Sequence, residues 1–234
     1  MNFYPPLLPG TLIKRYKRFL ADVELADGKL VTAHCANTGA MTGCAEPGSA
    51  VWLQLSSNLK RKLPYSWQIS CTQQGHWIGI NTLNANTLVA EGIATKAIIE
   101  LQGYDKVQRE VKFGDDNSRI DFCLTAAHRP DCYVEVKSAT FLDNHQGYFP
   151  DAKTVRGQRH VRELANIAQQ GKRAVLLFLV QHSGIDAVHI AKHIDEVYHH
   201  ALLQGMAAGV EVLAYSTKIS PEKILINQSI PTIV

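Results

Sequence analysis

The sequence has no long apolar run and no leader-like beginning. The stretch AVLLFLV at 174–180 has the length of a strand, far short of the roughly 20 apolar residues that span a bilayer. The first residues, MNFYPPLLPG, are interrupted by prolines before an apolar segment can form, and the chain then turns basic, the reverse of a secretory signal. We therefore expect a cytoplasmic protein that does not contact a membrane.

Cysteine and histidine motifs for metals or disulfides are also missing. The five cysteines are odd in number and form no CxxC pair, which argues against a disulfide framework or zinc site and fits a reducing compartment. His189 and His193 have helical i,i+4 spacing, but no acidic residue stands between them as in HExxH. Solvated or core histidines are therefore favoured over histidine ligands.

A strong charge of either sign is absent as well. The 234 residues carry a formal net charge of +3, which permits a polyanionic partner without requiring one. The clustering of the cations therefore matters more than their total. A hydrophobic share of 46% indicates an ordinary globular chain, and its length suits one or two domains.

The pattern of apolar residues divides the chain near residue 82. Before that point, short β-like runs alternate with turn signals such as DGK at 27–29. The runs occupy residues 11–25, 29–37, 49–57, 65–73 and 76–81. Five short strands without a helical pattern predict a small barrel over residues 1–81, and an OB-like fold is the commonest candidate. A different five-stranded barrel is the alternative.

Helices and strands alternate over residues 82–234. Helical patterns occupy 84–93, 157–171 and 194–205, and strand patterns occupy 109–113, 118–125, 132–139, 173–181 and 210–219. The continuous apolar run at 173–181 is typical of a strand buried on both faces. This arrangement predicts an α/β domain with a mixed sheet and flanking helices.

Charged residues interrupt one of these predicted strands, YVEVKSATF at 133–141. Because side chains alternate along a strand, Glu135 and Lys137 share one face. On the preceding strand we expect Asp121 to point one way and Ile120 and Phe122 the other. If the two strands form a hairpin, Asp121 and Glu135 converge at the sheet edge.

Two carboxylates brought together repel each other unless a cation or a proton joins them. Their hard oxygen ligands suit Mg²⁺ or Mn²⁺, and Lys137 is placed to orient or deprotonate an attacking water. The ExK spacing is weak evidence by itself, because REVKF repeats it with Glu110 and Lys112. For either copy the alternative is a solvent-facing ion pair. Only the second copy follows a strand carrying RID and precedes an α/β crossover.

Longer motifs make the pattern more specific. They are NTGAMTGC at 37–44, SNLKRKLPYSW at 57–67, SRIDF at 118–122, YVEVKSATF at 133–141 and YFPDAKTVRGQRHVREL at 148–164. Together they resemble the sugar fermentation stimulation protein A family over nearly the whole chain. The resemblance implies an N-terminal OB-like domain, a C-terminal domain of the PD-(D/E)xK nuclease class and non-specific DNA binding. The family name reflects an effect on sugar utilisation and not a known reaction.

The resemblance also assigns residues. The acid of the second strand of the nuclease class corresponds to Asp121, and the ExK pair corresponds to Glu135 and Lys137, so Asp121 and Glu135 are the expected ligands of Mg²⁺ or Mn²⁺. A helix glutamate that is frequent in that class is similar in placement to Glu91. The chain departs from the class pattern at Ile120, where a proline would precede the acid.

The start of the predicted helix at 157–171 is a candidate phosphate site. Arg156, Arg159 and His160 lie at a helix N-terminus, where basic side chains and the helix dipole favour an anion. The alternative is that Asp151 and Thr154 cap this helix while the arginines lie in solvent.

Two basic clusters in the first half are candidate contacts to a nucleic-acid backbone. The first cluster surrounds Tyr16 and Phe19, and the second precedes Tyr65 and Trp67. Their cations are Lys14, Arg15, Lys17 and Arg18 in the first cluster and Lys60, Arg61 and Lys62 in the second. OB-folds stack bases on aromatic residues along a basic groove, but aromatic residues of a small barrel are more often core.

Three functions remain open at this point. The first is a non-specific DNA-binding protein with a nuclease-like metal site that hydrolyses phosphodiester bonds, with RNA left open as a partner. The second is a DNA-binding transcriptional regulator of sugar (maltose) utilisation whose site has no nuclease turnover. The third is an RNA-processing enzyme of the OB type. The sequence does not fix the oligomeric state.

Overall fold

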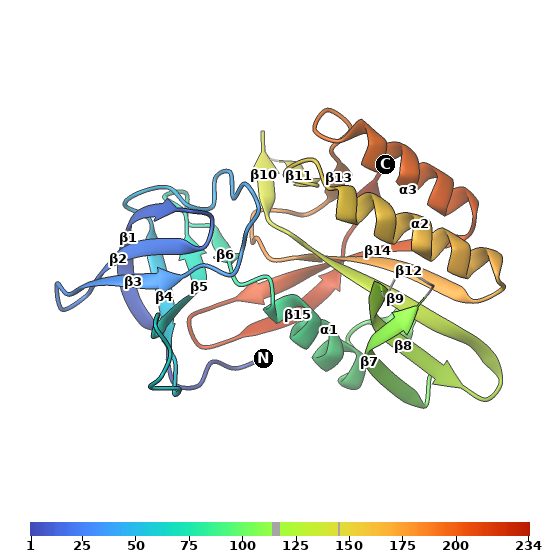
Figure 1. Cartoon of the computed structure of the whole chain (residues 1–234), viewed down its shortest axis with the longest axis horizontal. Helices are drawn as coiled ribbons and strands as arrows, with labels where there is room; N and C mark the ends of the chain where they lie inside the picture. The colour runs from blue at the N-terminus through green and yellow to red at the C-terminus, as the bar shows by residue number, and fades with distance from the viewer. Residues whose placement is uncertain (114–117, 145) are drawn as a thin grey trace.

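The computed structural model describes residues 1–113, 118–144 and 146–234. The first half of the chain forms a closed barrel beside a larger α/β part (Figure 1). The barrel strands are β1 Leu8–Tyr16, β2 Leu20–Leu25, β3 Leu30–His34, β4 Ala50–Leu55 and β5 Tyr65–Cys71. They follow the order β3-β2-β1-β4-β5, and a parallel pairing of β3 with β5 closes the sheet. The OB-like five-stranded barrel is therefore confirmed.

Two details of the barrel differ from the pattern in the sequence. The run at 11–25 is not one strand but β1 and β2, joined by a turn in which Lys17 and Arg18 have φ of 49° and 65°. Such left-handed residues are usually glycine or asparagine, so this turn carries no sequence signal. The run at 76–81 forms β6 Trp77–Gly79, which pairs with β5 outside the closed barrel.

The larger part is built on a mixed main sheet of order β15-β14-β12-β9-β8-β7. Its strands are β7 Lys106–Phe113, β8 Ser118–Ala126, β9 Arg129–Ala139, β12 Arg173–Val180, β14 Val210–Ile219 and β15 Ile224–Ser229. β9, β12 and β14 run parallel, and the outer pairings are antiparallel. A small sheet beside it contains β10 Phe141–Asp143, β11 Gln146–Phe149, β13 Val188–Ile190 and β16 Thr232–Ile233. The mixed sheet predicted for this half is confirmed.

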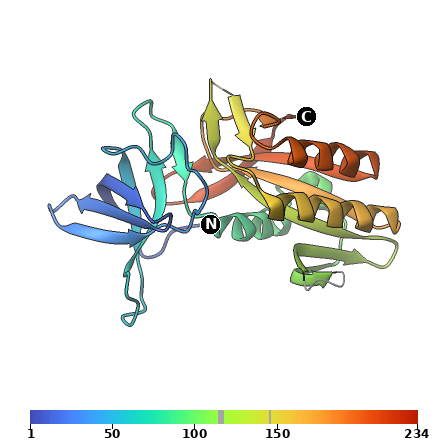
Figure 2. The ribbon, with the colours of Figure 1, turned by 45° about the horizontal axis from the view of Figure 1, so that its top comes forward.

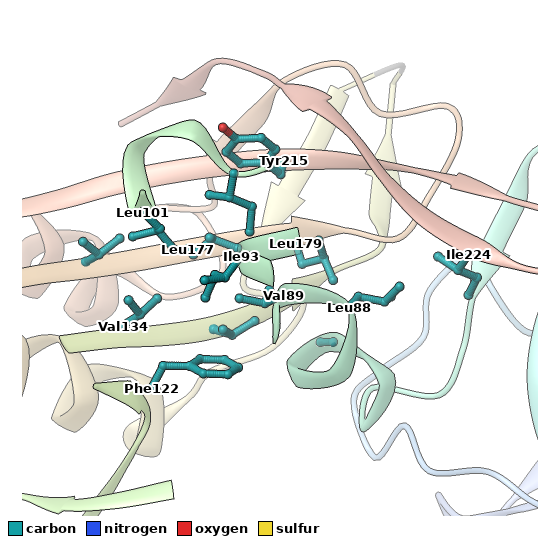
Figure 3. Packing of buried hydrophobic residues seen from close by; sticks show 14 of the residues in the cluster. Leu88, Val89, Ile93, Leu101, Phe122, Val134, Leu177, Leu179, Tyr215 and Ile224 are labelled. Atoms are coloured by element: carbon teal, nitrogen blue, oxygen red, sulfur yellow. The ribbon is translucent and has the colours of Figure 1, made fainter. Parts of the chain in front are cut away.

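Helices cover both faces of the main sheet (Figures 1 and 2). They are α1 Asn84–Ala94 on one face, α2 Val155–Gln169 and α3 Glu196–Ala207 on the other, and the short 3₁₀ turn η1 Ile99–Leu101. Strand β12 is buried on both faces, as its apolar run predicts: Leu177 faces α1 and Phe178 faces α2 and α3. Figure 3 shows Leu88 and Val89 of α1 among the side chains of the first face.

The barrel and the α/β part share backbone hydrogen bonds. Ile78 of β6 forms an antiparallel bridge with His182, and Gly79 N donates to Gln181 O at 2.9 Å. Near the N-terminus, Phe3 and Leu7 are buried in the core between α1 and the main sheet. None of the helices in the described ranges combines the length and the apolar character needed to cross a bilayer.

Candidate functional site

Two neighbouring strands bring Asp121 and Glu135 together. The β8–β9 ladder reaches Phe122↔Val134, and one further step in this register places Asp121 opposite Glu135. Asp121 Oδ2 there accepts a hydrogen bond from Val136 N at 2.8 Å, so a carboxylate takes the position of a ladder acceptor. Its Oδ1 accepts a second bond from Asn86 Nδ2 of α1 at 2.6 Å.

This local departure from the ladder corrects the expected facing of β8. Phe122 packs in the core under α1, whereas Ile120 packs in the core under α2 and α3. The two side chains therefore do not share a face; β8 pairs with β9 only from Phe122 onward, and the β7–β8 ladder has no pair between those of Phe122 and Ile120. As a result Asp121 reaches α1 on one side of the sheet edge and β9 on the other.

Glu135 is buried, with only 4% of its surface exposed. Its Oε1 accepts from Lys137 Nζ at 2.7 Å and also contacts His160 Nδ1 in a short hydrogen bond. The two charged side chains of the ExK motif therefore form a desolvated ion pair, which differs from the solvent-facing pair of the alternative interpretation. A buried carboxylate with this environment is held ionised and fixed in position.

His160 belongs to this buried network and not to an exposed basic surface. Its exposed fraction is 4%, and its Nε2 lies 3.2 Å from Arg156 Nε. Because the Arg156 Nε–H can only donate, Nε2 must accept, so the proton of a neutral imidazole is on Nδ1 and points to Glu135. His160 therefore points inward from the second turn of α2 to Glu135 of β9, and it is not exposed beside the other cations predicted to contact nucleic acid.

The two acids have pKa values that are shifted in opposite directions. Burial, followed by the nearby charge of Glu135, raises the pKa of Asp121 above its ordinary value. Burial alone would raise the pKa of Glu135 too, but the His160 hydrogen bond and the Lys137 charge outweigh it, so that pKa is lowered. Pairs of carboxyl groups with separated pKa values in one cavity are typical of functional sites.

Asp121, Glu135 and Lys137 line one cavity of about 420 Å³, which we call the acid cavity. The N-terminal ends of α1 and α2 and parts of β7, β8 and β9 form its walls. Arg109 and Arg156 add two cations to the lining. A cavity lined by both carboxylates and cations suits a metal ion together with a phosphate group.

The donor set of the acid cavity fits a magnesium-type ion. Among the described residues no cluster of three or more His, Cys, Asp or Glu side chains is arranged around one metal position. Mg²⁺ is commonly held by one or two carboxylates, with water and substrate phosphates completing its coordination. Asp121 and Glu135 supply two such carboxylates.

Three lining residues of this cavity, Asn86, Arg109 and Glu110, were not among the predicted site residues. Glu110 belongs to the first ExK copy, and the β7–β8 pairs Arg109↔Phe122 and Val111↔Ile120 place it opposite Asp121. Its φ of 53° is a left-handed conformation inside a strand, which is strained for a side chain other than glycine. The ExK spacing was a signal for Glu110, because a β7–β8 hairpin in this register brings the glutamate of the first copy to the cavity that contains Glu135 and Lys137.

Glu91 does not reach the acid cavity. Its carboxylate pairs with the N-terminal ammonium of Met1. Glu91 follows Asn86 by five residues, a rotation of about 140° around the helix, so the two side chains leave α1 on different sides. The glutamate role that the resemblance gives to Glu91 is therefore not supported by its position, and the amide of Asn86 is the contribution of α1.

The loop before α2 combines the two interpretations given above. Thr154 caps the helix by accepting from Gly157 N at 3.0 Å, and Arg156 lines the acid cavity. Arg159 is exposed and pairs with Glu163 at 3.5 Å. Asp151 does not cap α2, because its Oδ2 accepts from Met41 N of the barrel at 3.4 Å.

The basic residues of the barrel separate into several environments. Arg15 is structural, since its Nη2 donates to the carbonyl oxygens of Arg18, Asn37 and Gly39. Lys14 pairs with Asp22 at 3.6 Å. The cluster Lys60, Arg61 and Lys62 lies in the exposed loop between β4 and β5, which projects from the barrel (Figure 2).

The aromatic residues beside these clusters are largely structural. Trp67 is completely buried in the barrel core, and Tyr16 donates from its hydroxyl to Asp22 at 3.1 Å. Phe19 remains 46% exposed at the β1–β2 turn. The interpretation of Trp67 as a core residue is therefore correct.

Comparison with known proteins covers both parts of the structure. Residues 83–223 match the family model described as the sugar fermentation stimulation protein RE domain, and residues 13–80 match the SfsA N-terminal OB domain. The chain belongs to the sugar fermentation stimulation protein family. The OB domain of that family corresponds to the barrel, and its RE domain corresponds to the part that contains Asp121, Glu135 and Lys137.

Two relatives match this chain over its full length. A sugar fermentation stimulation protein homolog of Pseudoalteromonas atlantica is 62% identical over 234 residues, covering 100% of both sequences. The structure of Pyrococcus furiosus SfsA in complex with Ca²⁺ is similar with a TM-score of 0.88 and 26% identity. That match covers 100% of this chain and 98% of the other. The family resemblance read from the motifs is therefore confirmed.

Proposed function

We propose that this protein binds DNA without sequence preference and hydrolyses its phosphodiester bonds with the help of a divalent metal ion. The observation that carries the proposal is the meeting of Asp121, Glu135 and Lys137 in one cavity with Arg109 and Arg156. Carboxylates alone would repel a phosphodiester. A metal cation held by the carboxylates, together with the two arginines, would favour its approach. The relative from Pyrococcus furiosus is described in complex with Ca²⁺, which also prefers oxygen ligands and so supports a divalent site.

Five charged residues of the acid cavity have proposed roles. Asp121 and Glu135 would hold Mg²⁺ or Mn²⁺, whose chemistry is to polarise the phosphate and lower the pKa of a bound water. Lys137 Nζ, held 2.7 Å from Glu135 Oε1, is placed to orient the attacking water or to offset charge that develops on the phosphate. Arg109 and Arg156 would bind non-bridging phosphate oxygens.

The test measures cleavage of single-stranded DNA, double-stranded DNA and RNA with Mg²⁺ or Mn²⁺. Glu135→Gln and Lys137→Met should each reduce cleavage by at least about 100-fold, since each removes a group that acts on the metal or the phosphate. Glu46→Gln, which removes an exposed carboxylate of the barrel, is the matched control. Cleavage that survives both cavity substitutions would come from a contaminant or from another site.

Binding is measured separately from cleavage. Non-specific DNA binding should show little sequence preference and weaken steeply as salt increases, because phosphate contacts release counterions. Salt-independent affinity would contradict this half of the proposal. DNA binding without cleavage under every metal condition would instead favour the transcriptional regulator without turnover.

A further inference from the structure

A second cavity lies between the barrel and the α/β part. This interdomain cleft has a volume of about 470 Å³. One wall is formed by Arg15, Arg18 and residues 38–40 of the barrel, and the other by residues 149–154 before α2. Its size is that of a small-ligand pocket, typically about 300–1,000 Å³.

The interdomain cleft adjoins the acid cavity. Both cavities are lined by Thr154, the N-cap residue of α2. A smaller bridging cavity of about 60 Å³ shares Gly39 and Asp151 with the cleft. The bridging cavity also shares Thr82 and Ser138 with the acid cavity. The shared lining residues place the cleft next to the acid cavity across the start of α2.

The charges of the cleft favour an anionic ligand. Arg18 and Lys153 are exposed, and within the described part of the chain neither side chain forms an ion pair. Asp151 is the opposing charge in the lining, and it is engaged by Met41 N. With Arg15 included, three cations face one carboxylate, and the positive end of the α2 dipole lies at Thr154.

Hydrogen bonds hold the backbone of the barrel wall in place at Arg18. The guanidinium of Arg15 donates to the carbonyl oxygens of Arg18 and Gly39, which ties the β1–β2 turn to the loop at 37–40. Lys17 and Arg18 both have left-handed φ, a conformation that persists only where its surroundings fix it. The turn is therefore a fixed feature of the cleft.

We propose that the interdomain cleft is a second phosphate-binding subsite, in which Arg18 and Lys153 hold a phosphate of a single nucleic-acid strand that continues into the acid cavity. This inference rests on the proposed function and names its substrate as a strand that is single in this region. The cleft lies between two parts of the molecule, and its volume of about 470 Å³ is too small for a base-paired duplex to lie inside it. A single strand can follow the path over the N-terminus of α2.

The test measures binding in EDTA, so that cleavage plays no part. A short fluorescent oligothymidylate is titrated at several salt concentrations with the double variant Arg18→Gln/Lys153→Gln. Its matched control is Lys29→Gln/Lys96→Gln, which also removes one exposed cation from each part of the molecule. Both pairs are exposed, and thermal unfolding is expected to be alike in all three proteins.

The cleft variant should lose about tenfold in affinity, and its salt slope should fall by about 1.4, since each lost contact to a single strand removes about 0.7. The control should change affinity by less than twofold. Equal losses in the two double variants would overturn the subsite. A duplex of the same length that binds more tightly and suffers the same loss would overturn the single-strand assignment.

These results are separable from those of the proposed function. If the cleft variant loses affinity but the wild-type protein never cleaves with any metal, the subsite stands and the nuclease proposal fails. If the wild-type protein cleaves and both double variants bind like it, the nuclease proposal stands and the subsite fails. A parallel titration with oligouridylate separates binding of DNA from binding of RNA. The phosphate contacts are common to the two polymers, whereas only RNA carries a 2′-hydroxyl group.

Discussion

His160 Nδ1 donates a hydrogen bond to Glu135 Oε1 while its Nε2 accepts one from Arg156 Nε. The buried imidazole therefore joins the acid at the base of the cavity to a cation of its lining. Lys137 Nζ also lies 3.1 Å from His160 Nδ1, so the ring packs against both members of the ExK motif. These contacts identify His160 as a positioning residue.

Substitution of His160 separates its two contacts. His160→Asn can keep a donor near the position of Nδ1 but does not reach Arg156, whereas His160→Leu removes both contacts. We expect His160→Leu to lower the free energy of unfolding by about 1–3 kcal/mol, because the Glu135 carboxylate stays buried without one of its donors. His160→Asn should recover much of this stability and of kcat, with a raised KM for DNA. Urea unfolding and initial cleavage rates test this. Identical behaviour of the two variants would show that the Glu135 contact is unimportant.

The two acids should affect stability in opposite directions when no metal is bound. The pKa of Asp121 is raised in the folded state, so its contribution to stability is present below the unfolded pKa and is lost as pH rises through the folded pKa. In EDTA at neutral pH, Asp121→Asn should therefore raise Tm, since Asn86 can turn its amide to accept from the new side chain. This gain should disappear below the ordinary aspartate pKa of 3.8.

Glu135→Gln should lower Tm under the same conditions. The pKa of Glu135 is lowered, so its contribution to stability is present above the unfolded pKa and is lost as pH falls through the folded pKa. Loss of the charge leaves Lys137 partly buried without its counter-ion, which should destabilise the fold by on the order of 2 kcal/mol. Calorimetry of both variants across pH is the measurement. Tm changes of the same sign at pH 7 would contradict the assigned environments.

Asp195 joins the N-termini of two helices. It is 2% exposed, and its carboxylate accepts from Thr154 N at 2.8 Å and from Tyr198 N at 2.9 Å. Burial alone would raise its pKa, but these backbone donors, with Gln158, outweigh burial and lower it. The resulting stability is present above the unfolded pKa and is lost as pH falls through the folded pKa.

Asp195→Asn should therefore destabilise the protein by about 2 kcal/mol at pH 7, because the amide nitrogen of asparagine cannot accept from a backbone N–H. The difference from the wild-type protein should shrink as pH falls below 3.8, the ordinary aspartate value. Urea unfolding at pH 7 and in acid measures both quantities. A constant difference across this range would mean that the charge of Asp195 is not what caps the helices.

Glu110 should contribute to cation binding through its charge. It lies opposite Asp121 in the β7–β8 ladder and lines the acid cavity, so Glu110→Gln should weaken Mn²⁺ binding by about threefold at low salt. Glu91→Gln should leave Mn²⁺ affinity unchanged, because its carboxylate is paired with the Met1 ammonium. Isothermal titration with Mn²⁺ compares them. A larger effect at Glu91 would return the helix glutamate to the site.

Local pattern predicted much of the fold. The apolar run of β12 and the alternating runs of the barrel reflect which side chains are buried. The apolar composition of a segment and the spacing of its apolar residues indicate this burial directly. The β1–β2 turn was missed because Lys17 and Arg18 adopt left-handed φ without glycine or asparagine. Phe3 and Leu7 lie in a core made by residues distant in sequence, and no local pattern reveals such a contact.

The candidate site was predicted in part for the same reason. Strand alternation and hairpin register brought Asp121, Glu135 and Lys137 to one cavity. The inward position of His160 depends on how the N-terminal half of α2 lies on β9, and the position of the Asn86 amide depends on where α1 crosses the sheet edge. Such placements between elements are set by tertiary packing and leave no periodic signal in the chain.

The junction at β6 has a consequence for how the molecule recognises a partner. Trp77 N donates to Ser183 Oγ, Ser183 N donates to Trp77 O, and Gly79 N donates to Gln181 O. Three hydrogen bonds therefore join β6 to the segment that follows β12. Hinge motion at this junction would have to break these hydrogen bonds, so we expect the barrel and the α/β part to keep a nearly constant separation. If the protein binds a nucleic-acid strand as proposed, the strand must adapt its shape to the protein, and crosslinks placed across the β6 junction should leave binding unchanged.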